Sequence, residues 1–390
     1  MMQGNVFRIY PDDEQKTLIE KHIGSSRFIY NRFLHIKKVF YEKFRIDISL
    51  LELEKYLPMF KEIYPWLKEV NSQSLQQERK NLQDAYSRFF KGQNGFPKWK
   101  TKKENNKSFQ IPQRYRLNLT SSKVFLPGIG WMKIKMHRDM FSPEFLENLI
   151  ETTEVKGEVI VEKDLNAEFL RTATVRRTPT GKYYISILME DREEYPEIQE
   201  YSEDTTVGID LGIKDFAIIS TGEKIANPKF LKTSLSRLKT FQRRVSRKLK
   251  GSNNRRKAVK QLAKIHEKIS NQRHDFQHKE SNTLLSENQA VAVETLNIKG
   301  MKKNHKLAQA ISDSAWGSFV SKLEYKAKRL GKTVFRIGMW EPSTKTCNVC
   351  GYHNQDITLD VREWECPDCR TVHDRDINAA INIKKFALTT

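Results

Sequence analysis

The amino-acid sequence predicts a multidomain α+β protein. Three changes of pattern along its 390 residues support this class. Apolar residues recur at helical spacing from Pro11 to about Lys91, and short strand-like runs follow from Phe109 to about Met189. From Thr206 onwards, apolar strands alternate with helical stretches. We therefore expect about two to four domains, including an α/β domain whose sheet is at least partly parallel.

Composition indicates a polyanionic partner. The chain carries 69 Lys and Arg against 48 Asp and Glu, a formal net charge of +21. Such a surplus favours nucleic acid. A membrane is excluded, because no apolar run approaches the roughly 18 residues that a span requires. The first residues lack an apolar secretory core, so we expect a cytoplasmic protein.

The first part of the chain is predicted to be a strand followed by helices. Asn5 to Tyr10 alternates like a strand, and Pro11-Asp12-Asp13-Glu14 is typical of a helix start with acids in its first turn. The apolar stripes that follow indicate the core of a helical bundle. Polar residues between the stripes are free to face a ligand. They include Arg27, Asn31, Arg32, Gln76 and Lys80.

A basic loop interrupts the helices between Lys91 and Lys107. Phe96 and Trp99 lie there among several lysines, punctuated by glycine and proline. Aromatic rings interleaved with lysines suit a surface that contacts nucleic-acid backbone and bases. A solvated basic linker with two anchored aromatic residues is the alternative.

Phe109 to about Met189 is predicted to form a small antiparallel barrel or sandwich. Its strand-like runs are divided by Pro127-Gly128, Asn166 and Thr180-Gly181. The acidic, turn-rich stretch from Glu193 to Asp204 is typical of a linker to the next domain.

A strongly basic stretch runs from Arg237 to Lys279, with fifteen Lys or Arg and two Asp or Glu. Its apolar periodicity predicts two long helices broken near Gly251-Ser-Asn-Asn254. A charge run is often only a solvated face. So many like charges on one helical hairpin would repel one another, however, which favours direct contact with phosphates.

Three acidic residues lie at the edges of predicted elements in the α/β region. Asp210 lies within an apolar strand, Glu294 ends another, and Asp376 stands where the last helix begins. Each has a structural alternative: a hydrogen bond to the turn around Gly212, a cap of the next segment, or a helix N-cap. Together they suit two Mg²⁺ or Mn²⁺ ions about 3.5–4 Å apart, in a site that hydrolyses phosphodiesters.

The four cysteines form two Cys-x-x-Cys pairs separated by fifteen residues: Cys347, Cys350, Cys366 and Cys369. In a reducing compartment this spacing predicts zinc rather than disulfides. Four thiolates leave no open coordination position, so this zinc is expected to be structural. A redox role, or a plain zinc-ribbon binding module, is the alternative. The position between two acidic segments favours an insertion in a nuclease.

These motifs together resemble the TnpB family of transposon-encoded, RNA-guided nucleases, relatives of the type V CRISPR effectors. The resemblance spans nearly the whole chain. Its most specific part is Asp374-Arg375-Asp376-Ile-Asn378-Ala379-Ala380 after the cysteine pairs. The remaining similar motifs are Arg8-Ile-Tyr10-Pro11 with Gln15, Gly24-Ser-Ser-Arg27-Phe28-Ile-Tyr30-Asn31, Gly95-Phe-Pro97-Lys-Trp-Lys100, Gly208-Ile-Asp210-Leu-Gly212, Val293-Glu294-Thr-Leu296 and Pro342-Ser343-Thr-Lys345-Thr-Cys347. Ser343-Thr344-Lys345 departs slightly from the usual Ser-Ser-Lys.

The resemblance implies a domain plan. A RuvC-like nuclease domain with an RNase H fold would cover residues 196–390 and carry Asp210, Glu294 and Asp376, with a zinc ribbon inserted at 343–372. A wedge-like β-barrel domain would combine residues 1–10 and 109–195. A helical recognition domain would cover residues 11–108.

The resemblance also implies partners and an activity. It implies a monomer carrying a guide RNA from the transposon end, which cleaves double-stranded target DNA beside a short transposon-adjacent motif. The nucleic-acid contacts that we expect are Arg27, Tyr30, Asn31, Ser72, Gln76, Trp99, Lys100, Gln110, Arg243, Arg244, Arg247, Lys248, Arg255 and Arg256. A guide-RNA-dependent repressor, or an accessory transposition factor without cleavage, is the alternative, and such relatives would lack one or more of the three acids.

Overall fold

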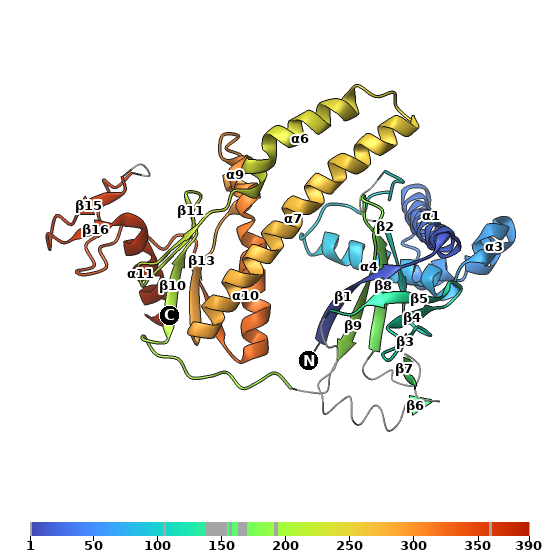
Figure 1. The fold of residues 1–390 in the computed structure, drawn as a ribbon, viewed down its shortest axis with the longest axis horizontal. Coiled ribbons are helices and arrows are strands. Elements are labelled where there is room, and N and C mark those ends of the chain that lie inside the picture. The colour runs from blue at the N-terminus through green and yellow to red at the C-terminus, as the bar shows by residue number, and fades with distance from the viewer. Residues whose placement is uncertain are drawn as a thin grey trace. The chain divides into compact units, whose positions relative to one another are not determined.

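The computed structural model divides the chain into two compact units, Met1–Glu193 and Glu194–Thr390 (Figure 1). The structure describes residues 2–103, 107–137, 154–155, 158–162, 170–190, 194–358 and 361–389. The predicted turn at Asn166 lies outside these residues. No helix within the described part of the chain combines the length and apolar character needed to cross a bilayer.

The first unit begins with a strand and a long helix, as the sequence predicts. Asp12 caps α1 by accepting from the Gln15 amide, and the Gln15 side chain accepts from the Asp12 amide. The capped helix and the shorter ones after it enclose an apolar core that includes Phe33, Leu53 and Leu75. The helices are α1 (Asp13–Phe44), α2 (Leu50–Glu54), α3 (Leu57–Ile63), the 3-10 helix η1 (Pro65–Glu69) and α4 (Ser72–Phe90).

The strands of the first unit form one nine-stranded sheet in the order β2-β8-β9-β1-β5-β4-β3-β7-β6, with every pair antiparallel. The pairings of the described residues leave β2 and β6 at the ends, so they do not close the expected barrel. The strands are β1 (Met2–Tyr10), β2 (Lys107–Ile111), β3 (Arg116–Asn118), β4 (Lys123–Leu126), β5 (Gly130–Lys135), β6 (Glu154–Val155), β7 (Glu158–Glu162), β8 (Leu170–Arg177) and β9 (Tyr183–Glu190).

The second unit is built on a five-stranded mixed sheet in the order β12-β11-β10-β13-β14. Strands β10, β13 and β14 run parallel, and β11 runs antiparallel to β10. The sheet is therefore partly parallel, as the alternation of strands and helices predicts. Its strands are β10 (Thr206–Asp210), β11 (Asp215–Ile219), β12 (Lys224–Ala226), β13 (Ala290–Glu294) and β14 (Thr333–Ile337).

Helices cover both faces of this sheet (Figure 1). Val291 and Val293 face one side, where they pack with apolar residues of α7 (Asn253–Glu287) and α10 (Trp316–Leu330). Ala292 faces the other side and contacts α11 (Arg375–Thr389). The helix α11 approaches β10 so closely that a Cβ on Gly208 would lie 2.0 Å from the Ala380 carbonyl oxygen. Glycine is therefore required at position 208 because any side chain would clash with α11, and not because of its backbone conformation.

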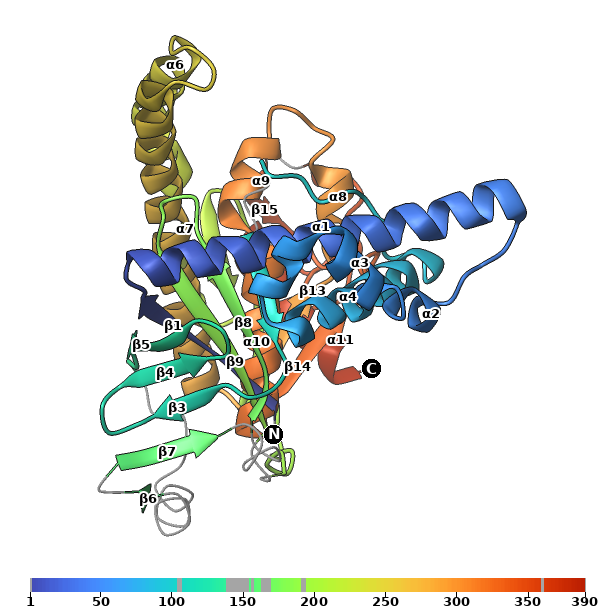
Figure 2. The same cartoon turned by 90° about the vertical axis from the view of Figure 1, so that its right-hand side faces the viewer.

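The basic stretch forms the predicted helical hairpin, α6 (Phe230–Ser246) and α7, whose tip extends away from the sheet of the second unit (Figures 1 and 2). The helical stretch between residues 304 and 330 is broken into two helices. Ala315 adopts a left-handed conformation with φ 52°, which separates α9 (Ala308–Ser314) from α10. A short helix, α8 (Ile298–Met301), precedes them.

Candidate active site and zinc site

Asp210 and Glu294 end neighbouring parallel strands. Ile209 is opposite Val293 in the register of β10 and β13, so the next residue on each strand is one of the two acids. The carboxyl of Asp210 hydrogen-bonds the Glu294 side chain. Burial, this bond and the charge of Glu294 together raise the pKa of Asp210 well above its usual value. Two carboxyl groups so placed cannot both ionise easily without a cation between them.

Asp376 lies in the first turn of α11, and it does not cap that helix. Asp374 performs this role, because its Oδ1 accepts hydrogen bonds from the backbone amides of Asp376 at 3.0 Å and Ile377 at 3.1 Å. The Asp376 side chain is thereby left for other contacts. Its charge contributes to the raised pKa of Asp210. The N-cap alternative for Asp376 is therefore wrong.

Two of the three acids line a cleft of about 840 Å³ in the second unit. Asp210 and Asp376 lie on its wall, whereas Glu294 contacts Asp210 and is not one of the lining residues. The same cleft is lined by positively charged side chains from several loops and helices. They are Lys214, Lys229, Lys232, Lys306, Arg362 and Arg375. Carboxylates surrounded by cations match a substrate that carries phosphates.

The cleft also contains an acid that the sequence did not single out. Asp313, at the end of α9, accepts from the backbone amides of Leu231 and Lys232 in the first turn of α6, at 2.9 and 3.3 Å. It also pairs with Arg273 of α7 at 2.8 Å. Since the N-cap residue Lys229 offers no side-chain cap, Asp313 fixes the base of the basic hairpin beside the cleft.

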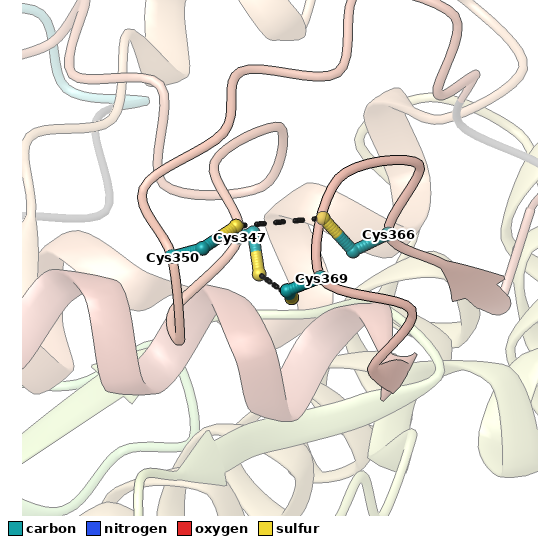
Figure 3. Close-up of side chains that lie close together, drawn as sticks. All are labelled: Cys347, Cys350, Cys366 and Cys369. Carbon is teal, nitrogen blue, oxygen red and sulfur yellow. Dashed lines mark hydrogen bonds between the residues drawn. The ribbon is translucent and has the colours of Figure 1, made fainter.

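The four cysteine side chains converge from two loops (Figure 3). Their sulfur atoms all lie within 4.8 Å of one another, and the Cys347–Cys369 and Cys350–Cys366 pairs are each 3.6 Å apart. Zinc with Zn–S bonds of about 2.3 Å would place its sulfur ligands about 3.8 Å apart, so the residues fit this metal. Hydrogen bonds with Thr371 lower the pKa of the Cys369 thiol to about 6, whereas burial and the neighbouring thiols raise the pKa of the Cys350 thiol to about 12.

Among the described residues, the cysteines are the only set of three or more metal-ligating side chains gathered so tightly. The three carboxylates are looser. Asp210 and Glu294 are in contact, but Asp376 forms ion pairs with Arg362 and Arg375. Of the three acids predicted to converge, Asp210 and Glu294 are thus in contact, and Asp376 lies beside them.

The zinc segment is attached directly to α11. The Asn378 side chain accepts from the Asn348 amide at 2.9 Å and donates to the Thr346 carbonyl at 2.8 Å. Asn382, one turn further, donates to the Ser343 carbonyl at 2.8 Å. The second cysteine pair lies in the hairpin of β15 (Glu363–Glu365) and β16 (Val372–Asp374), which leads into α11. The sequence motif contained Asn378, but its role depends on this contact.

The predicted nucleic-acid contacts of the first unit fall into two groups. Ser72 and Gln76 are exposed one turn apart on α4, and Trp99 is 49% exposed. Arg27 lines a second cavity, beside Trp66, and Gln110 on β2 is partly buried. Contact of these five residues with nucleic acid stays a prediction.

Tyr30, Asn31 and Lys100 form an internal clamp instead. Tyr30 is only 5% exposed, and the Lys100 ammonium lies 4.0 Å from its ring centroid. Asn31 bonds both the amide and the carbonyl of Lys100, at 2.9 Å each, and the Lys100 ammonium pairs with the buried Glu78. The prediction that Tyr30 contacts nucleic acid is corrected for its ring, which belongs to the helical core.

The basic hairpin presents most of its predicted cations to solvent. The exposed ones near its tip are Arg243, Arg244, Arg247, Lys248 and Arg256. Arg255 differs, because its guanidinium donates to the carbonyls of Val245 at 2.8 Å and Lys248 at 3.0 Å. This arginine closes the turn between the two helices.

Three stretches of the chain match known families. Residues 186–305 match the OrfB_IS605 family, described as "Probable transposase", and residues 316–383 match "Cas12f1-like, TNB domain". Residues 1–45 match a family described as "Helix-turn-helix domain". In this structure that stretch is β1 followed by the single long helix α1.

Relatives match the chain over almost its full length. It is 36% identical over 384 residues to a Streptomyces pristinaespiralis protein named as an RNA-guided DNA endonuclease, covering 97% of this chain and 87% of that one. It is 27% identical over 399 residues to InsQ of Escherichia coli K12, which is named in the same way, with 98% and 91% covered. A chain of the Cas12f1–sgRNA–target DNA complex shares the fold, with a TM-score of 0.50, 14% identity and 98% of each chain covered.

Proposed function

Because this chain belongs to the TnpB family of transposon-encoded RNA-guided DNA endonucleases, we propose that Asp210, Glu294 and Asp376 form its DNA-cleaving site. The observation that carries this proposal is the hydrogen-bonded pair of Asp210 and Glu294 at the carboxyl ends of two parallel strands. In sheets of this kind, sites collect at such strand ends. Asp376 stands beside the pair on α11, in a cleft lined by lysines and arginines.

Divalent cations suit this set of oxygen ligands. Asp210, Glu294 and Asp376 would hold Mg²⁺ or Mn²⁺, the ions that carboxylates prefer over zinc. When bound, two such ions would supply a more acidic water and charge stabilisation for the departing 3′ oxygen. The side chains of the cleft would do the rest. Metal binding would favour the ionised form of Asp210, whose pKa is raised in the free protein, and the lysines would attract the phosphodiester backbone.

The four cysteines would hold one structural zinc, separate from this chemistry. They offer four sulfur ligands and therefore no open position for substrate. Because the zinc segment is bonded to α11 through Asn378, the zinc would stabilise the helix that carries Asp376. Four thiols arranged to bind a metal would require a reducing compartment, so we infer a cytoplasmic location.

The partners are a guide RNA from the transposon end and double-stranded target DNA. The guide–target duplex would be held by its backbone, and the exposed cations of the α6–α7 hairpin suit this contact. Ser72 and Gln76 on α4 would help to read the short motif beside the target. The position of β1 in the middle of the first unit's sheet supports grouping residues 1–10 with 109–195 as a wedge domain, next to a recognition domain at 11–108. Residues 196–390 would then be the nuclease domain, with the ribbon at 343–372.

A repressor that binds DNA without cutting it is not favoured. All three acids are present, and two of them line an open cleft. The experiment that tests the guided function is to express the protein with its flanking transposon DNA and sequence the RNA that copurifies. One enriched species with a constant scaffold and a variable 3′ end is expected. A folded, zinc-loaded protein with no enriched RNA would reject guidance.

A further inference from the structure

Both oxygens of the Asp376 carboxylate are engaged by arginines. Arg375 donates to Oδ1 through Nη2 at 2.6 Å and Nε at 2.9 Å. Arg362 donates to Oδ2 through Nη1 at 2.6 Å. A divalent cation bound by Asp376 needs at least one of the same oxygen atoms, at about 2.0–2.2 Å. Cation binding and at least one of these two ion pairs therefore compete.

The two arginines are held very differently. The Arg375 side chain is 9% exposed, next to the acid in sequence, and it lies at the base of α11. The Arg362 side chain is 50% exposed and lines the cleft. An ion pair with a half-exposed partner is weak and easily exchanged with solvent, whereas a buried one is costly to break. Arg362 is therefore the partner that can leave.

The backbone of Arg362 is anchored although its side chain is free to move. Its carbonyl accepts from the Arg375 amide at 2.8 Å, at the point where the β15–β16 hairpin pairs Glu363 with Asp374. The same hairpin carries Cys366 and Cys369. The backbone of the zinc segment thus holds Arg362 within reach of Asp376.

We propose that Arg362 is a positioning residue that neutralises Asp376 in the free protein and is displaced from Oδ2 when a divalent cation binds. This inference rests on the proposed function of the three acids. It assigns the zinc ribbon a second role, because one of its own side chains sets the affinity of the nuclease site for its metal. The affinity of the free protein is lower than its three carboxylates alone would give.

The expected effect is modest and has an unusual sign. Removal of a merely structural ion pair would loosen α11 and weaken metal binding. Removal of a competing cation strengthens metal binding, by about two- to fivefold for a half-exposed pair. Arg362→Gln should therefore bind Mn²⁺ more tightly than the wild-type protein, because this variant no longer places a positive charge on Asp376.

The test is a Mn²⁺ titration of the zinc-loaded protein without nucleic acid, in which electron paramagnetic resonance counts the free ion. The matched control is Lys306→Gln, which removes one positive charge from the same cleft at a residue that does not pair with Asp376. Arg362→Gln should bind two- to fivefold more tightly than Lys306→Gln. Zinc content and melting temperature confirm that each variant is folded.

The variant Asp210→Asn distinguishes failure of the proposed metal site from failure of the proposed role of Arg362. If its Mn²⁺ binding is abolished while Arg362→Gln binds no more tightly than Lys306→Gln, the metal site stands and the role of Arg362 is rejected. If no protein, Arg362→Gln included, binds Mn²⁺ at a site that Asp210→Asn removes, the proposed nuclease site itself is rejected. Tighter binding in Lys306→Gln alone would also overturn the proposal.

Discussion

The carboxyl of Asp210 shares a hydrogen bond with that of Glu294 because the two residues follow the paired positions Ile209 and Val293 on adjacent parallel strands. This relationship helps to raise the pKa of Asp210, and so favours its protonated form when no cation is bound. It also connects the chemistry of the cleft to the packing of the sheet, since the strands that end in these acids are buried by α11 on one face and by α7 and α10 on the other.

The raised pKa of Asp210 predicts a pH-dependent stability. In the unfolded chain, Asp210 has an ordinary pKa of about 3.9, and in the folded protein burial and Glu294 raise it. The folded protein therefore binds more protons, so the stabilisation is complete below about pH 4 and is lost as pH rises through the folded pKa. Urea unfolding of zinc-loaded protein without Mg²⁺ should show the wild type losing stability relative to Asp210→Asn as pH rises. Parallel curves would contradict this.

The link between the zinc segment and α11 predicts that Asn378→Ala keeps the zinc but weakens the second unit. Asn378 is 1% exposed, so truncation leaves the Asn348 amide and the Thr346 carbonyl without this partner. We expect a loss of about 1–3 kcal/mol in unfolding free energy, together with slower DNA cleavage. Asn354→Ala is the control, because its side chain bonds only within the ribbon, to the Asp356 amide. Cys347→Ser should instead release the zinc. If Cys347→Ser and Asn378→Ala contained the same amount of zinc, the assignment of Cys347 as a zinc ligand would be rejected.

Close packing of α11 on β10 predicts that Gly208→Ala is strongly destabilising. The new methyl group would meet the Ala380 carbonyl at 2.0 Å, and neither backbone can move without opening the layer. A loss of about 1–3 kcal/mol or more is expected in chemical denaturation. Gly4→Ala, in β1, is the matched strand control because nothing lies within 4 Å of its Cβ position. Similar midpoints for the two variants would show that the helix does not sit as tightly as described.

The hairpin cations predict a salt-dependent effect on nucleic-acid binding. Arg243→Gln with Arg247→Gln removes two exposed charges without breaking a packed interaction. Affinity of the guide-RNA complex for target DNA should fall, and the slope of log affinity against log salt should decrease by about one for each phosphate that is no longer bound. Arg255→Gln should behave differently and lower the melting temperature, because that guanidinium ties Val245 to Lys248. If the salt dependence of the double variant equals that of the wild type, these two arginines of the hairpin do not contact nucleic-acid phosphates.

The sequence predicted those elements whose pattern is local. The strand that ends at Glu294 was predicted, because a short, wholly apolar run in an α/β region is buried on both faces. The break between the two helices of the hairpin, near Gly251, was also predicted from the sequence. Ala315 was not, since alanine gives no signal of the left-handed conformation that splits α9 from α10.

The acids of the site were found because carboxylates inside apolar strands are costly, but their partners were not. Arg362 reaches Asp376 only through the register of the β15–β16 hairpin, and Asp313 caps a helix about 80 residues before it. Tyr30 was predicted from its motif to contact nucleic acid, whereas its position on α1 directs the ring into the core. Contacts between distant segments carry no periodic signal, which explains these differences.

The most direct test of the account is DNA cleavage by the guide-RNA complex of the wild type and of Asp210→Asn and Glu294→Gln, under single-turnover conditions with Mg²⁺. Guide binding and target binding by each complex are measured alongside. The account predicts that both variants bind RNA and target DNA like the wild type but cut at least a hundredfold more slowly, with ~10²-fold being the scale for loss of a group acting at the reacting centre. Cleavage at the wild-type rate by either variant would contradict the assignment of this carboxylate pair as the nuclease site.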